Sequence, residues 1–390
     1  MSHLLNLYKR LPVTIVKGEG SYLYDENDKK YIDFTSGIAT VNFGHCNRYI
    51  ADKLKEQIDR LWHCSNLLYT KEQEDVAKRL ADCTFADKVF FCSSGLEAIE
   101  ATIKFVRKYF SQIGKDYKNR IITLKNGFHG RSIAGVSACG SNFAKKGFAP
   151  LLQGFDNILP NDIDHLKKAI TKKTAAILLE PLQSEGGINV IDKNYLKELC
   201  NIAQENQILV CIDEAQTGFG RMAKLFHYQN LDIKPDILAC AKGMGNGFPI
   251  GACLLKKEVA EKIEPGSHGG TYSGNPLAMT VCNAVLDLIE QDKMLEKIKQ
   301  MSLYLKTNLE KLKQKFPLII KSIKGECMLL GIEFTPKIDS FDFLIRCAKN
   351  GLLMTKTSDK NVIRILPVLT ISKADVDKAV HILEKTLSSI

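Results

Sequence analysis

Between residues 88 and 255 the chain alternates short apolar runs with amphipathic stretches. The apolar runs are KVFFC, NRIITLK, AAILLEP, ILVCIDE, DILAC and GACLL, and helical segments such as NYLKELCNIAQEN separate several of them. Strands and helices that alternate in this way predict an α/β fold, in which a mostly parallel sheet carries helices on both faces. A length of 390 residues allows a large domain of this kind with a smaller one attached.

The two ends of the chain follow a different pattern. Near the start, VTIVKGEGSYLYDENDKKYIDF alternates apolar and polar residues around two turns, which predicts a hairpin, and a helix is expected at about residues 50–61. A long helical region, about residues 279–316, precedes strands near CMLLGIEF and NVIRILPVL and a final helix. We therefore expect a small α+β domain formed by residues 1–50 and 281–390, with residues 51–280 forming the large domain.

Charge and cysteine patterns limit the function classes. The net charge is +10, but lysines are interspersed with acidic residues, so we expect a solvated surface and no nucleic-acid partner. The sequence shows neither a membrane-spanning run nor the apolar stretch of a signal peptide, so no membrane partner is expected. The 12 cysteines include no CxxC pair, and several lie in apolar runs, as is typical of a reducing compartment. We expect a cytoplasmic protein.

Two of the apolar runs end at side chains with reactive chemistry. Asp213 ends one run, and Lys242 follows another, ahead of three glycines within five positions. A single lysine is usually a solvated charge, but the apolar residues before Lys242 favour a buried amine that forms an imine with an aldehyde. A nearby aspartate suits the protonated ring nitrogen of pyridoxal phosphate. The pair therefore indicates a site for this cofactor.

Other runs also end in polar or aromatic residues, each with a simpler explanation beside the functional one. Ser94 and Gly95 suit either a phosphate-binding helix N-terminus or a plain N-cap. Phe128 suits stacking on a flat ring or core packing, while Arg131 suits carboxylate binding or the surface. Polar groups at several strand ends mark the ligand edge of a parallel sheet. The further polar residues that follow strands in this sequence are Glu180, Glu185, Glu214 and Gln216. Paired carboxylates suit a metal, but no histidine lies at ligand spacing.

Taken together, these segments resemble the class III (ornithine-type) aminotransferases, which are fold type I enzymes. The resemblance covers almost the whole chain and rests on motifs in a fixed order: SGIATVNFGH, SSGLEA, FHGRS, EPLQSEGG, DEAQTGFGR, AKGMGNGFPIGA, HGGTYSGNPLA and VIRILPVLTIS. It implies a seven-stranded sheet in the large domain, pyridoxal 5'-phosphate as cofactor, and a homodimer with shared active sites. SGIATVNFGH and FHGRS are most similar to family members that act on acetylornithine.

The resemblance implies a role at the cofactor for each matching residue. Lys242 would hold pyridoxal phosphate as an imine and then move a proton as general base, while Asp213 would keep the ring nitrogen protonated. Phe128 would stack on the ring, and Gln216 would lie near the phenolic oxygen. The phosphate would be bound by a helix N-terminus and by the neighbouring subunit, through Ser94, Gly95, Leu96 and Thr271.

The resemblance also implies a substrate site with two arginines. Arg131 would hold the α-carboxylate of N2-acetyl-L-ornithine, and Arg364 would hold 2-oxoglutarate, pairing with Glu185 while the long amine is bound. Ile38 stands where ornithine-specific relatives carry a tyrosine, and Gly270 belongs to the same substrate-binding set. The implied reaction moves the terminal amine of acetylornithine to 2-oxoglutarate. It yields N-acetyl-L-glutamate 5-semialdehyde and L-glutamate, which is a step of arginine biosynthesis.

Departures from the family pattern leave other activities open. Leu96, Ser132, Ser184 and Val368 replace residues that are usual in the family, and Ser184 adjoins Glu185. The same site suits N-succinyl-L,L-diaminopimelate, an acylated amine of lysine biosynthesis, as an alternative or second substrate. A more remote alternative is a nicotinamide-dependent oxidoreductase on a doubly wound sheet. A catalytically silent binding protein is disfavoured because Lys242 and Asp213 are both present.

Overall fold

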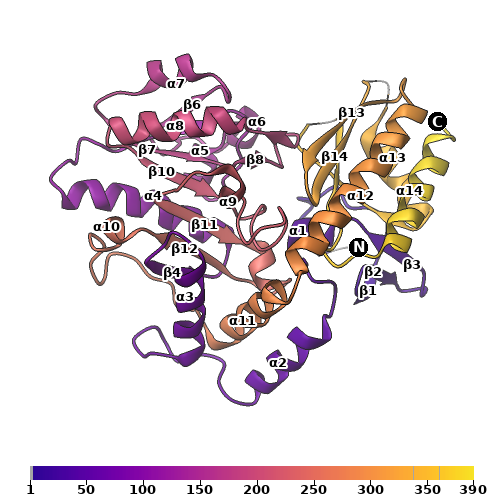
Figure 1. The fold of residues 1–390 in the computed structure, drawn as a ribbon, viewed down its shortest axis with the longest axis horizontal. Helices are drawn as coiled ribbons and strands as arrows, with labels where there is room; N and C mark the ends of the chain where they lie inside the picture. Colours follow the sequence, from indigo (N-terminus) through magenta and orange to yellow (C-terminus); the bar gives the residue numbers. More distant parts are fainter. Residues whose placement is uncertain (1–2, 337, 360) are drawn as a thin grey trace.

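The centre of the structure, a computed structural model that describes residues 3–336, 338–359 and 361–390, is a seven-stranded sheet (Figure 1). In spatial order its strands are β4 (Lys88–Cys92), β12 (Gly251–Leu255), β11 (Ile237–Ala241), β10 (Leu209–Asp213), β7 (Thr174–Leu179), β5 (Arg120–Leu124) and β6 (Phe155–Ile158). Only β12 runs antiparallel to its neighbours in this sheet. The predicted mostly parallel sheet is confirmed. The edge strand β6 carries no apolar run, because FDNI is short and half polar.

The inner strands of this sheet, such as β7, β10, β11 and β12, are buried on both faces because their side chains alternate between two cores. In β11, Leu238 and Cys240 belong to a core that includes residues of α3, α8 and α11, while Ile237 and Ala239 belong to a second core beneath α4. Continuous apolar runs such as DILAC are the expected sequence of such strands. The helices of this large domain are α2 (Arg48–Ile58), α3 (Lys71–Cys83), α4 (Gly95–Gln112), α5 (Ile133–Ala138), α6 (Asn142–Lys145), α7 (Ile163–Ala169), α8 (Lys193–Glu205), α9 (Tyr228–Leu231), α10 (Lys257–Ala260) and α11 (Pro276–Glu290).

Both ends of the chain build the small domain, at the right of Figure 1. Strand β3 pairs in parallel with β15, which joins the N-terminal hairpin to the C-terminal segment, and Ile32 and Phe34 share a core with its helices. The predicted small α+β domain is confirmed. Its elements are β1 (Ile15–Glu19), β2 (Tyr22–Asp25), β3 (Lys30–Asp33), α1 (Ser36–Ala39), α12 (Met294–Lys315), β13 (Ile320–Glu326), β14 (Leu329–Phe334), α13 (Ser340–Lys349), β15 (Leu352–Leu353), β16 (Thr355–Lys356), β17 (Val362–Ile365) and α14 (Lys373–Leu387).

The long helical region expected at residues 279–316 is two helices, α11 and α12. Helix α11 ends at Glu290, because the backbone of Gln291 leaves the helical conformation (ψ 144°), and α12 begins after Lys293, whose backbone is left-handed (φ 60°). Helix α11 packs into the large-domain core as far as Ile289. We therefore propose that the domain boundary falls after Glu290 and not at residue 280. Across the described residues, the structure contains no helix with the length and apolar character needed to span a membrane.

Candidate active site

A cavity of about 700 Å³ lies where the parallel strands of the large sheet end, against the small domain. This is the edge at which open α/β sheets bind their ligands. Most of the residues predicted to form a site line this cavity: Ile38, Ser94, Gly95, Leu96, Phe128, Arg131, Glu185, Asp213, Gln216, Lys242 and Arg364. Gly270 and Thr271 do not.

Asp213 and Lys242 meet because their strands are neighbours in register. Strands β10 and β11 pair in parallel with Asp213 opposite Ala239, and Lys242 directly follows the end of β11. Parallel strands end at the same edge of a sheet, so the carboxylate and the amine lie at one rim. The sequence spacing of 29 residues therefore becomes a direct juxtaposition.

Lys242 begins the short 3-10 turn η1 (Lys242–Gly245), with a left-handed backbone (φ 47°). Burial lowers the pKa of its amine below 10.5, while the negative charges of Asp213 and Glu180 act in the opposite direction. Desolvation has the larger effect because water no longer stabilises the ammonium form. Burial thus favours the neutral, nucleophilic form of the amine more than water does.

Asp213 is a buried carboxylate with fixed partners. Its Oδ2 lies 3.0 Å from Nδ1 of His129, and its Oδ1 accepts a hydrogen bond of 3.1 Å from the backbone N–H of Ala215. The sequence interpretation did not assign a role to His129, although this residue lies within the FHGRS motif. A lone histidine after a strand carries no signal of its own, because its carboxylate partner is 84 positions away.

Phe128 and Arg131 belong to the loop after β5. The backbone N–H of Phe128 donates a hydrogen bond of 2.7 Å to Glu180, and the Arg131 guanidinium lies 5.2 Å from the centre of the Phe128 ring. Burial, followed by the charge of Asp213, raises the pKa of the Glu180 carboxyl well above its usual value. The hydrogen bond from the Phe128 backbone to Glu180 therefore fixes the loop that places the Phe128 ring at the cavity.

Helix α4 directs its N-terminus at the cavity. Ser94 is the N-cap of α4, since its hydroxyl accepts a hydrogen bond from the backbone N–H of Glu97. The N-cap role expected for this serine is therefore confirmed. The next N–H groups, of Gly95 and Leu96, belong to the first turn, where a helix offers no internal acceptors. A side chain at position 95 would meet Ala241 at 3.2 Å. Glycine therefore lets the helix start approach β11 and leaves an anion-binding end at the cavity.

Arg364, on β17, enters the cavity from the small domain. Its Nη1 donates a hydrogen bond of 2.6 Å to Oε2 of Glu185, and only 4% of its side chain is exposed, against 31% for Glu185. Gln216 donates from Nε2 to the backbone carbonyl of Ile38, at 3.3 Å. Beside Glu185, the hydroxyl of Ser184 is buried without a hydrogen-bond partner among the described residues.

Gly270 and Thr271 lie in the exposed loop before α11. Asn66 joins this loop to another exposed segment, because its Nδ2 donates to the carbonyls of Gly270 and Ser273. Four large apolar side chains are exposed in these two segments, by 92% for Leu67, 61% for Leu68, 91% for Tyr69 and 66% for Tyr272. The two loops form one apolar surface that the single chain leaves uncovered.

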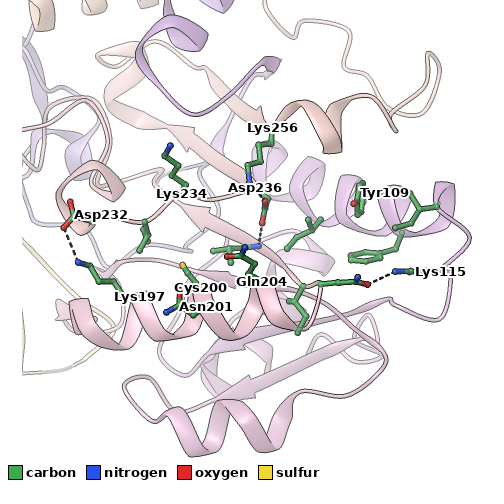
Figure 2. Close-up of a pocket in the computed structure, with 17 residues that line it drawn as sticks. Tyr109, Lys115, Lys197, Cys200, Asn201, Gln204, Asp232, Lys234, Asp236 and Lys256 are labelled. Atoms are coloured by element: carbon green, nitrogen blue, oxygen red, sulfur yellow. Dashed lines mark hydrogen bonds and ion pairs between the residues drawn. The ribbon is translucent and has the colours of Figure 1, made fainter.

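A second cavity, of about 780 Å³, lies at the opposite ends of β10 and β11 (Figure 2). Three of its four lysines have a partner in the same cavity: Lys115 bonds to the amide oxygen of Gln207, Lys197 pairs with Asp232, and Lys256 pairs with Asp236. Most charges of this cavity are therefore paired internally. We assign it no function.

Comparison with known proteins gives consistent matches. The family model described as aminotransferase class-III matches residues 6–387. The acetylornithine aminotransferase of Agrobacterium fabrum is 42% identical over 387 residues, or 99% of this chain and 96% of that protein. The solved acetylornithine aminotransferase of Elizabethkingia anophelis has a TM-score of 0.88 at 30% identity, covering 100% of this chain and 97% of the other. An ornithine aminotransferase of Toxoplasma gondii, described with partial occupancy of PLP at its active site, has a TM-score of 0.95 at 28% identity, covering 100% and 92%.

Proposed function

The chain belongs to the class-III aminotransferases, and on this premise we propose that it moves the terminal amine of N2-acetyl-L-ornithine to 2-oxoglutarate. The products are N-acetyl-L-glutamate 5-semialdehyde and L-glutamate, so the reaction belongs to arginine biosynthesis. The observation that carries the proposal is a cavity with Lys242 and Asp213 at its base and an arginine from each domain at its walls, Arg131 and Arg364. Family membership makes the protein a pyridoxal phosphate-dependent enzyme, which removes the nicotinamide alternative.

The residues around the cavity fit pyridoxal 5'-phosphate. When bound, this cofactor supplies an aldehyde that exchanges amines and a ring that accepts electrons. Lys242 would hold it covalently, and the N-terminus of α4 would bind its phosphate through Ser94, Gly95 and Leu96. Two polar atoms at this site, Oε1 of Gln216 and Nε2 of His129, are buried without a partner among the described residues. A site with free acceptors and donors of this kind is prepared for a polar ligand.

Charge placement assigns the catalytic work to two residues. Lys242 would act as general base and take a proton from the carbon that bears the amine, and burial, which lowers the pKa of its amine, favours the neutral form that this role needs. Asp213 would hold the ring nitrogen of the cofactor, and His129, 3.0 Å from its carboxylate, fixes the orientation of that carboxylate. Phe128, which lines the cavity, would cover the ring of the cofactor and limit the access of water.

The two arginines divide the two half-reactions between them. Arg131 binds the α-carboxylate of acetylornithine, which leaves the terminal amine to reach Lys242. Glu185 neutralises Arg364 during this half-reaction and releases it when a dicarboxylate arrives. Ile38 presents an apolar wall, which suits an acylated amine better than a free α-amino group.

We propose a homodimer in which each subunit completes the other's site. The exposed surface formed by Leu67, Tyr69 and Tyr272 supports an interface between copies, because an apolar area of this kind on a soluble protein is normally covered. Thr271 and Gly270 lie on the same surface, so in a dimer they would contact the partner's phosphate and substrate. The twelve cysteines are all unpaired, which supports a reducing, cytoplasmic location.

A second candidate substrate is N-succinyl-L,L-diaminopimelate. Arg131 is exposed at the cavity, and Ile38 is 41% exposed there, so the acyl end of the substrate lies toward solvent. An open acyl end leaves room for a larger succinyl group. This activity, of lysine biosynthesis, would be alternative or additional.

A half-reaction screen tests the proposal. The protein with bound cofactor is mixed with acetylornithine, succinyl-diaminopimelate, ornithine or 4-aminobutyrate, and the loss of the cofactor's visible absorbance is followed. We expect acetylornithine to react with the highest kcat/KM. Faster reaction of ornithine or 4-aminobutyrate would reject the proposed substrate, and faster reaction of succinyl-diaminopimelate would select the second candidate.

A further inference from the structure

Arg221 is a fully buried arginine whose guanidinium contacts only neutral oxygens. Nη1 donates to the carbonyls of Met328 and Pro367, at 3.0 and 2.5 Å, and Nη2 donates to Asn42 Oδ1 and Ser36 Oγ, at 2.6 and 3.3 Å. Burial lowers its pKa to about 9, which still leaves the group charged at neutral pH. A buried charge without a carboxylate is costly, so its four acceptors have to be held in place.

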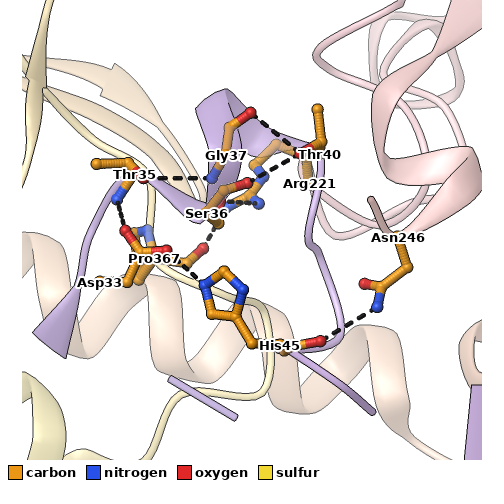
Figure 3. A network of polar contacts seen from close by, with 10 residues as sticks. Asp33, Thr35, Ser36, Gly37, Thr40, His45, Arg221, Asn246 and Pro367 are labelled. Carbon is orange, nitrogen blue, oxygen red and sulfur yellow. Dashed lines mark hydrogen bonds and ion pairs between the residues drawn. The ribbon is translucent and has the colours of Figure 1, made fainter. Parts of the chain in front are cut away.

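These acceptors come from three separate parts of the chain. Arg221 lies in the loop after β10 of the large domain, Ser36 and Asn42 belong to the N-terminal segment, and Met328 and Pro367 belong to the C-terminal part of the small domain. Figure 3 shows the guanidinium between Ser36 and Pro367. One side chain therefore ties both halves of the small domain to the loop that begins at Asp213.

The segment that Arg221 holds has an unusual backbone. Four successive residues of α1 are left-handed: Ser36 (φ 38°), Gly37 (φ 61°), Ile38 (φ 62°) and Ala39 (φ 59°). Residues other than glycine resist this conformation because Cβ approaches the following carbonyl oxygen. Such a turn persists only where its surroundings over-determine it.

Local hydrogen bonds support the turn but do not fix its position. The backbone N–H groups of Ile38 and Ala39 donate to the Thr35 carbonyl, and the Thr40 hydroxyl donates to the Gly37 carbonyl at 3.0 Å (Figure 3). These bonds all lie within the segment. The contacts of Ser36 with Arg221 and of Ile38 with Gln216 connect the turn to the large domain.

Three of the four groups bound by Arg221, those of Ser36, Pro367 and Asn42, lie close to a residue of the cavity. Ser36 is two residues before Ile38. Pro367 is three residues after Arg364, and in between the N–H of Leu366 donates to the Phe34 carbonyl. Asn42 lies against Gly243, next to Lys242, so closely that a Cβ at Gly243 would be 2.2 Å from its Nδ2.

We propose that Arg221 is a positioning residue, which fixes the left-handed Ser36–Ala39 turn and the strand end beyond Arg364 at a set distance from the Lys242 rim. The acyl-facing wall at Ile38 and the carboxylate-binding Arg364 are thereby placed for their two substrates. The inference rests on the proposed aminotransferase function and deepens it, because it identifies what sets the width of the substrate site between the domains. Arg221 itself does not line the cavity.

The test compares holoenzymes with Arg221→Met, Arg221→Lys, Ser36→Ala and, as control, Arg107→Met. Arg107 is also partly buried with a lowered pKa and donates to the Gln153 carbonyl, but it lies on α4 outside the cavity. Bound cofactor is measured by absorbance, and KM and kcat are measured for 2-oxoglutarate and for the best amine of the wild type. A wild type inactive on acetylornithine would defeat the proposed function alone, because the variants are judged on the amine that it does accept.

We expect Arg221→Met to retain the cofactor and to raise KM for both substrates by about tenfold, because the turn at Ile38 and the strand end beyond Arg364 lose their fixed positions, with kcat within about threefold. Arg221→Lys should recover part of this loss because it restores the charge. Arg107→Met should leave both KM values unchanged. A lower Tm with unchanged KM, or a fall confined to kcat, would overturn the proposal. If Arg221→Met does not fold, Ser36→Ala decides: a rise in KM for the amine alone supports the proposal, and no change refutes it.

Discussion

Replacing Glu185 with glutamine tests whether this carboxylate competes with the dicarboxylate substrate for Arg364. In the structure the two side chains are joined at 2.6 Å, and Arg364 is almost entirely buried. A carboxylate of 2-oxoglutarate can bind Arg364 only by displacing Glu185. Glu185→Gln keeps the shape of the side chain and removes its charge, so the displacement becomes easier.

The size of the effect follows from the strength of the pair. At 2.6 Å the direct attraction is about 6 kcal/mol in a medium of intermediate polarity, and desolvation of the two groups offsets most of it. Hydrogen bonds to charged groups retain about 1.5–3 kcal/mol net. Since about 1.4 kcal/mol corresponds to a factor of ten, KM for 2-oxoglutarate should fall by roughly 10- to 100-fold.

Steady-state kinetics with both substrates provide the assay. KM for acetylornithine should change little, because that substrate is bound while Arg364 remains unused, and inhibition by glutamate should become stronger. The matched control is Glu333→Gln, which removes the same charge from a pair with Lys321 outside the cavity. An unchanged or higher KM for 2-oxoglutarate in Glu185→Gln would refute the competition between Glu185 and the substrate.

Three further predictions concern the amine, the acylated substrate and the dimer. Lys242→Ala should lose the covalently held cofactor, and mass spectrometry of a borohydride-reduced digest should find the cofactor on the Lys242 peptide of the wild type only. In the apoenzyme, chemical labelling of the Lys242 amine should increase with pH, with a midpoint below 10.5 because burial lowers the pKa of the amine. A midpoint at or above 10.5 would contradict the assignment. Arg131→Ala should raise KM for acetylornithine by about tenfold, as expected for a lost charged hydrogen bond, while simple ω-amines change much less; equal losses would count against its role. Leu67→Asp should yield inactive monomers by size-exclusion chromatography, whereas Leu318→Asp, at an equally exposed leucine of the small domain, should remain dimeric and active.

The parts of the fold that the sequence predicts best are those dictated by one strand at a time. Strands β7, β10 and β11 are buried on both faces, so their apolar runs identify them without knowledge of their neighbours. The positions of Asp213 and Lys242 follow, because parallel strands end at one edge. The sequence does not predict the break between α11 and α12, because residues 291–293 contain neither glycine nor proline.

Long-range partners are what the sequence conceals. His129 becomes part of the site only through Asp213, and Arg221 only through acceptors up to 185 positions away. In the sequence each is one polar residue in a loop, for which surface exposure is the default expectation. The roles assigned to the cavity residues came instead from the order of the motifs, and the family resemblance behind them is confirmed. The roles themselves stay predictions.

Several residues in and around the cavity break the local rules of folding. Lys242 and the four residues of α1 have left-handed backbones, while Arg221 and Glu180 are titratable groups removed from water. None of these features stabilises the fold by itself. Each one moves a backbone turn or a charge to a place that a relaxed chain would not choose, beside the edge of the large sheet. Functional sites are where such conflicts are expected, because the rest of the structure can hold them. If so, variants that relieve the conflict, such as Ala39→Gly in the left-handed turn, should be tolerated for folding and harmful to substrate affinity. Unfolding temperature and KM for acetylornithine, measured on the same variant, separate these two effects: a KM that does not rise would show that the strain serves only the architecture.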